Sequence, residues 1–165
     1  MAWYLYAWPN LRDGMEFVMP SIKKMKIIAY SQEQMYALVN DVVNYKEFVP
    51  WCTESHILSQ TEDEIKATLA FSGSGLSKSF TTLNRLQPHK MIEIRLIDGP
   101  FRQLEGFWQF DAIGEERSKV SLDLEFEFST KIVGLMFGPV FHQVATTLVD
   151  AFCHRAEKVY GSGTA

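Results

Sequence analysis

The chain has few of the residues that bind metals or form disulfides. Its 165 residues include only 2 cysteines, Cys52 and Cys153, which stand far apart in the sequence. No pair of Cys or His residues has the spacing of a zinc ligand set, so we expect no metal site. Two lone thiols are typical of a protein from a reducing compartment. A single disulfide between them is the alternative.

Strong charge of one sign is also missing. The chain has 16 Lys and Arg against 20 Asp and Glu, a formal net charge of −4. Broad nucleic-acid binding depends on neutralising phosphates, so DNA is not an expected partner. The only dense basic group is Lys23, Lys24 and Lys26. We interpret it as the solvated end of a strand.

No uninterrupted run reaches the ~18 apolar residues of a membrane span. The first 18 residues lack the basic start of a signal peptide, and Pro9 breaks their apolar run early. We therefore expect a cytoplasmic protein. Residues 1–18 have no clear periodicity, and we interpret them as an extension outside the fold, with a small aromatic anchor as the alternative. The expected domain covers residues 19–160, beginning near Met19, and 161–165 form a tail.

Catalytic motifs are missing too. Gly73-Ser74-Gly75 lacks the third glycine of a dinucleotide-binding loop and lies between predicted strands. Asp98 is explained by turn chemistry, and Glu105 is expected on a solvated strand face. None of the 4 histidines has a spacing to a carboxylate or a cysteine that suggests a general base: His56, His89, His142 and His154. The sequence predicts a binding protein rather than an enzyme, with no required cofactor.

What the chain has in excess is aromatic side chains. They make up 13% of its residues and include 12 Phe. Side chains of this size fill a core, line a pocket or do both. The length fits one domain, which can bury enough surface to fold without a disulfide or metal.

The local patterns predict an α+β fold. A first strand runs from about residue 24 to 29, and Ser31 begins a helix over residues 32–40 with a capping box. A further helical turn ends before Pro50. From about residue 55 to 129, apolar and polar residues alternate with a period of two, most clearly over Val120–Phe128. This alternation predicts about six antiparallel strands with one face buried and the other in water.

Residues 130–160 return to a helical period, and Gly138-Pro139 is expected to kink that helix. The helix is the only predicted element long enough to cover the dry face of the sheet. We therefore predict a curved antiparallel sheet of about seven strands wrapped on one long C-terminal helix. Such a sheet and one helix cannot meet everywhere, so a cavity is expected between them.

Three segments carry a family resemblance. Residues 45–55, 98–108 and 126–128 resemble the START-like coenzyme Q-binding family of the polyketide cyclase/dehydrase superfamily. Within it they are most similar to the bacterial RatA-type ribosome-association toxins, and the similarity extends from about Met19 to Tyr160. The resemblance implies a helix-grip fold (START-like or Bet v-like) and an apolar tunnel for ubiquinone. It also implies no cofactor-dependent catalysis. Phe48, Pro50, Trp51 and Cys52 match the loop at the tunnel mouth.

Two functions follow as expectations. The first is a quinone-binding chaperone that supports respiratory electron transport, with ubiquinone or a similar isoprenoid lipid as its ligand and a peripheral contact with the inner membrane. The alternative is a toxin that binds the 50S ribosomal subunit, blocks 70S assembly and so inhibits translation initiation. The predicted ligand-binding residues are Phe48, Pro50, Trp51, Phe71, Phe80, Leu96, Phe101, Trp108, Phe126, Phe128, Phe137, Phe141, Val144 and Leu148.

The segment Ile132–Phe141 contains ten residues without charge. It is too short to span a bilayer but suits a membrane interface. We hypothesise that this half of the helix moves as a gate over the cavity, opposite the Pro50–Cys52 loop and with Phe141 at the entrance. The alternative is a static helix packed on the sheet.

Overall fold

The computed structural model describes residues 21–73 and 75–161. The predicted extension over residues 1–18, the predicted domain start at Met19 and residues 162–165 lie outside the described residues. In chain order the elements are β1 (Ser21–Ile28), α1 (Gln32–Asn40), the 3₁₀ turn η1 (Val42–Asn44), α2 (Tyr45–Phe48), β2 (Cys52–Gln60), β3 (Glu64–Gly73), β4 (Leu76–Gln87), β5 (Met91–Asp98), β6 (Phe101–Ile113), β7 (Arg117–Phe128) and α3 (Lys131–Tyr160).

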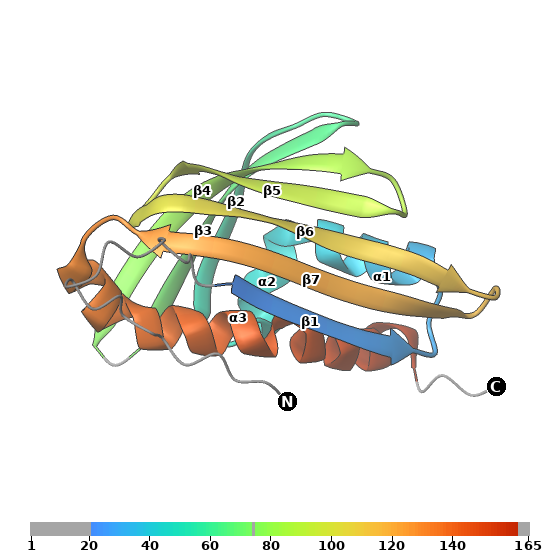
Figure 1. Cartoon of the computed structure of the whole chain (residues 1–165). Coiled ribbons are helices and arrows are strands. Elements are labelled where there is room, and N and C mark those ends of the chain that lie inside the picture. The colour runs from blue at the N-terminus through green and yellow to red at the C-terminus, as the bar shows by residue number, and fades with distance from the viewer. Residues whose placement is uncertain (1–20, 74, 162–165) are drawn as a thin grey trace, which may run out of the picture.

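All seven strands belong to one antiparallel sheet in the order β1-β7-β6-β5-β4-β3-β2. Figure 1 shows the sheet arched over the helices, with α3 running beneath β7 and β1 and the shorter helices on the same side. The predicted α+β fold, a curved seven-stranded sheet on a long C-terminal helix, is confirmed.

Local signals position the first helix as predicted. The Ser31 hydroxyl accepts a hydrogen bond from the backbone N–H of Gln34 at 3.1 Å, and the Gln34 side chain accepts one from the N–H of Ser31 at 2.9 Å. This capping box pairs two of the N–H groups that a helix start leaves unsatisfied. The helix then buries Met35, Leu38 and Val39 against the sheet.

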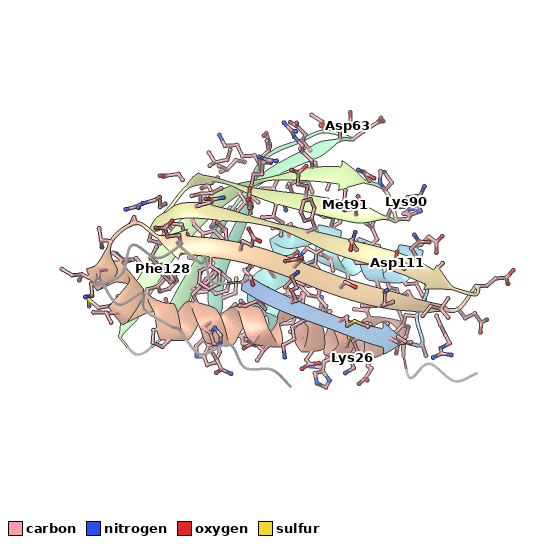
Figure 2. The ribbon with its side chains drawn as sticks, viewed as in Figure 1. Lys26, Asp63, Lys90, Met91, Asp111 and Phe128 are labelled. Atoms are coloured by element: carbon pink, nitrogen blue, oxygen red, sulfur yellow. The ribbon has the colours of Figure 1, made fainter. Side chains whose placement is uncertain are left out.

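The edge strand β1 carries apolar side chains on its outer face. Met25 and Ile27 lie on the outer side of the sheet, where 65% and 49% of their surface, respectively, is exposed to solvent. Lys26 lies toward α3 instead, where its Nζ is 3.5 Å from the carboxylate of Asp150 (Figure 2). Both side chains remain solvent-exposed, at 48% for Lys26 and 62% for Asp150, so this ion pair forms at a solvated strand end, as predicted. Because β1 lies at the sheet edge, the long lysine stem reaches past the core to the helix surface.

Helix α3 is continuous through Gly138-Pro139, where the sequence predicted a kink. It is helical from Lys131 to Tyr160 with Pro139 inside it, and the proline is exposed. The helix is long and apolar enough to cross a membrane by length and composition alone. A core helix passes the same test, and α3 places Phe137, Phe141 and Phe152 in the core of the domain.

Candidate functional site

An apolar cavity lies between the concave face of the sheet and α3. Its volume is about 80 Å³. The lining comes from five strands, the α1–α2 region and α3: Val39, Val42, Tyr45, Val49, Ala67, Leu69, Phe71, Phe80, Thr82, Asn84, Ile92, Ile94, Leu104, Trp108, Leu122, Leu124, Phe141, Val144, Ala145, Leu148 and Phe152. The expectation of a cavity in this place is therefore met.

The alternation of the strands explains why the lining is apolar. Every second residue of an antiparallel strand faces the same side, so β7 points Leu122 and Leu124 inward while Asp123 lies on the outer face. Space remains where inward-facing side chains are small, as at Ala67 of β3 and Ala145 of α3. The cavity thus follows from short side chains on facing elements, because the surrounding packing cannot collapse into it.

The structure brings six of the predicted ligand-binding residues to this cavity: Phe71, Phe80, Trp108, Phe141, Val144 and Leu148. They come from β3, β4, β6 and α3. The rings of Phe71 and Phe80 are stacked, with their centroids 5.7 Å apart. The rings of Trp108 and Phe152 pack edge to face, with their centroids 5.2 Å apart. These contacts form the rigid aromatic part of the lining.

Four further predicted residues pack on one another beyond the cavity. Phe101, Phe126, Phe128 and Phe137 form, with Phe80 and Phe141, what we call the aromatic cluster (Figure 2 labels Phe128). The rings of Phe101 and Phe126 each lie 4.8 Å from that of Phe141. These side chains fill the core at this end. Leu96 is partly buried and packs against the same core outside the cavity lining.

The loop predicted as the tunnel mouth lies apart from the cavity. Phe48 and Pro50 line a second, more open depression of about 380 Å³ between α2 and α3. The guanidinium carbon of Arg155 lies there over the Phe48 ring, 5.0 Å from the ring centroid. Trp51 is 44% exposed, and its backbone has a positive φ of 61°. The structure thus does not bring these three residues into the cavity.

The entrance hypothesised at Phe141 needs a correction. Phe141 is 4% exposed and lies at the centre of the aromatic cluster, so it is a core residue and not a surface gate residue. The exposed apolar side chains of this segment are Ile132, Leu135 and Met136, at the start of α3. Helical spacing predicted an apolar segment but did not show which side of the helix meets the sheet.

The sequence reasoning missed the polar part of the lining. Thr82 and Asn84 of β4 both border the cavity, and the Thr82 hydroxyl donates to the Asn84 side-chain oxygen at 3.0 Å. The available signal was the alternation Phe80, Thr82, Asn84, in which polar residues share a face with a core phenylalanine. The apolar residues contributed by α1 and the following turns, such as Val39 and Val42, were missed as well.

Burial shifts the pKa values of several side chains in the domain. Cys52 and Cys153 are free and buried, and burial raises the pKa of the Cys52 thiol to about 11, so it stays protonated at neutral pH. The Tyr45 hydroxyl donates a hydrogen bond to the Val39 carbonyl, and burial raises the pKa of that hydroxyl. Burial, helped by Lys24, lowers the pKa of His142. Among residues 21–73 and 75–161 no group of three His, Cys, Asp or Glu could hold a metal.

A curved sheet closed by one long helix around an apolar cavity defines a helix-grip protein. Residues 28–153 match the family described as polyketide cyclase / dehydrase and lipid transport. The chain therefore belongs to this family, and the resemblance seen in the sequence is confirmed.

Known proteins of three kinds are similar to the chain. The Ribosome association toxin RatA of Escherichia coli (strain K12) is 44% identical over 148 residues, which are 90% of this chain and 94% of that protein. The mitochondrial coenzyme Q-binding protein COQ10 homolog B of Xenopus laevis is 31% identical over 82% of this chain and 57% of its own length. The Zhui aromatase/cyclase of Streptomyces sp. R1128 has a TM-score of 0.74, covering 86% of this chain and 95% of that one. At 18% identity the last likeness shows the fold alone.

Proposed function

We propose that this protein associates with ribosomes through the large subunit and interferes with its joining to the small one. The observation that carries the proposal is the 44% identity to a ribosome association toxin over nearly the full length of both chains. This relation is closer than the one to the coenzyme Q-binding relative, at 31%. The two named relatives are a toxin and a binding protein, which supports a function without catalysis.

Sedimentation with isolated ribosomal subunits tests this function. We expect the purified chain to pellet with 50S subunits and not with 30S subunits, and to lower the yield of 70S particles when the two are mixed. Contacts between basic side chains and rRNA phosphates release counterions, so pelleting should weaken as the salt concentration rises. A chain that stays in the supernatant with 50S subunits at low salt would contradict the proposal.

The second candidate function is binding of ubiquinone or a similar isoprenoid lipid. Its support is the cavity, whose lining is mostly apolar. Each five-carbon isoprene unit costs roughly 4 kcal/mol to leave in water, at about 0.8 kcal/mol per buried carbon group. A carrier for such a lipid therefore needs an apolar container, and the concave face of the sheet provides one.

The size of the cavity implies that the ligand must widen it. A volume of about 80 Å³ is below the roughly 300–1,000 Å³ of a typical small-molecule site. The start of α3 is the segment suited to move, since it contains Gly134 and Pro139, both unfavourable inside a helix. The exposed side chains Ile132, Leu135 and Met136 would meet a membrane interface there. We place the protein in the cytoplasm, with this contact to the inner membrane.

Quinone titration followed by indole fluorescence tests the second function. A quinone bound in the cavity would lie against the Trp108 ring, which is 4% exposed, and would quench its emission. Trp108→Phe should remove most of the quenching. Trp51→Phe is the matched control, because Trp51 is exposed outside the cavity and its loss should leave the quenching intact. Absence of quenching in the unmodified chain, and of quinone in an organic extract, would contradict this function.

A further inference from the structure

Two polar side chains stand together in an otherwise apolar wall. Thr82 and Asn84 are two residues apart on β4, so both point to the concave face. The residues paired with them on the neighbouring strands are apolar: Ala67 and Leu96 flank Thr82, while Ile65 and Ile94 flank Asn84. Thr82 is buried, and Asn84 is partly buried.

The hydrogen bond between the two orients the amide. The Thr82 hydroxyl donates to Oδ1 of Asn84 at 3.0 Å, which leaves the two N–H bonds of Nδ2 as donors. Within the part of the chain that the structure describes, no group accepts a hydrogen bond from Nδ2. Asn84 is only partly buried, so water can reach Nδ2 when the cavity holds no ligand. A ligand that enters the cavity and displaces this water must supply an acceptor in its place, or the amide loses its hydrogen bond.

We propose that the Thr82–Asn84 pair recognises a carbonyl oxygen on the polar end of a mostly apolar ligand. This inference rests on the lipid-binding function proposed above and specifies the ligand chemistry. The carbonyl accepts a hydrogen bond from Asn84 Nδ2, while the rest of the molecule contacts apolar side chains. A single polar point in an apolar site determines the orientation of the bound molecule. A ring ketone of the quinone class has this chemistry, whereas a plain isoprenoid hydrocarbon does not.

Binding of two probes to matched variants tests the assignment. The probes are a short-tailed ubiquinone, which carries two carbonyl groups, and squalene, an isoprenoid hydrocarbon without oxygen. Asn84→Leu should weaken ubiquinone binding about tenfold, the factor for one lost hydrogen bond, and leave squalene binding unchanged or tighter. Asn84→Asp, which keeps the shape but removes the N–H donors, should also weaken ubiquinone binding.

Two further variants keep the test decisive. Thr82→Val removes the hydroxyl that orients the amide, so it should weaken ubiquinone binding even if an Asn84 variant does not fold. Thr81→Val is the control, because Thr81 lies on the opposite face of β4, where its hydroxyl is 2.7 Å from that of Thr68. It should leave both affinities unchanged.

The outcomes separate this proposal from the function on which it rests. Equal ubiquinone affinity in the unmodified chain and in the folded Asn84 and Thr82 variants would overturn the recognition role and leave the lipid-binding function standing. Failure of the unmodified chain to bind either probe would overturn both. Loss of squalene binding in parallel with ubiquinone would show that the substitutions damage the cavity, which also overturns the recognition role.

Discussion

Phe141→Glu should leave the domain unfolded or severely destabilised. The Phe141 ring is buried, and the rings of five other phenylalanines lie within 6.1 Å of it: Phe80, Phe101, Phe126, Phe128 and Phe137. Loss of a buried phenylalanine alone costs about 3–5 kcal/mol. A carboxylate in its place has no partner charge among these rings and adds a desolvation cost. Total stabilities of about 5–15 kcal/mol leave little margin for both.

Denaturant unfolding followed by circular dichroism measures this effect. Ile113→Glu is the matched control, because Ile113 lies at the end of β6 with 38% of its surface exposed and is paired with Arg117 of β7. That change should alter the free energy of unfolding by no more than about 0.5 kcal/mol, as is usual for surface substitutions. A Phe141→Glu chain as stable as the control, but unable to take up lipid, would restore the hypothesis that Phe141 forms an entrance.

Gly106→Ala should lower the free energy of unfolding by about 3 kcal/mol, the upper end of the cost of overpacking a core. Gly106 lies on β6 directly beside β7, and a Cβ atom added there would stand 2.3 Å from the carbonyl oxygen of Asp123 and 2.9 Å from a methyl group of Leu124. The carbonyl belongs to the backbone of the neighbouring strand. The two strands would have to move apart to accept one methyl group.

A glycine-to-alanine substitution in α3, at Gly134, is the control, and its expected effect on the free energy of unfolding has the opposite sign. The three atoms nearest to a Cβ atom at Gly134 all belong to the Phe128 side chain, at ordinary contact distances of 3.4–3.7 Å. Since alanine is the better helix former, Gly134→Ala should raise the stability by about 0.5–1 kcal/mol. If Gly106→Ala and the unmodified chain unfold at the same denaturant concentration, the sheet relaxes around the added methyl group and this prediction is wrong.

The fold could be predicted well because its signals are local. The faultless alternation over Val120–Phe128 predicted β7, whose inward residues Val120, Leu122, Leu124 and Phe126 are buried. The pairing of Ser31 with Gln34 predicted the start of α1 at the right residue. Each signal involves residues within one element, where backbone geometry alone determines which side chains share a face.

The candidate site could be predicted only in part. The excess of aromatic residues indicated a cavity, yet it did not separate the aromatic side chains that line it from those that pack together. Trp108 and Phe126 alternate inward on neighbouring strands in the same way, but one borders the cavity and the other fills the core. Both rings contact a phenylalanine of α3, Phe152 for Trp108 and Phe141 for Phe126, so a pairwise contact does not distinguish them and only the packing of the whole core does.

Periodicity and capping within short segments were enough to predict the set of elements, their order and the inward face of most strands. The position of the empty space was not predictable in this way, since it depends on the side chains that facing elements bring together from distant parts of the folded chain. The tertiary structure placed Asn84 of β4 in the wall of that space and Phe141 of α3 partly in the wall and partly in the core. It also turned Lys26 of the edge strand toward Asp150, because an edge strand has a neighbour on one side only and its long side chains can reach the helix.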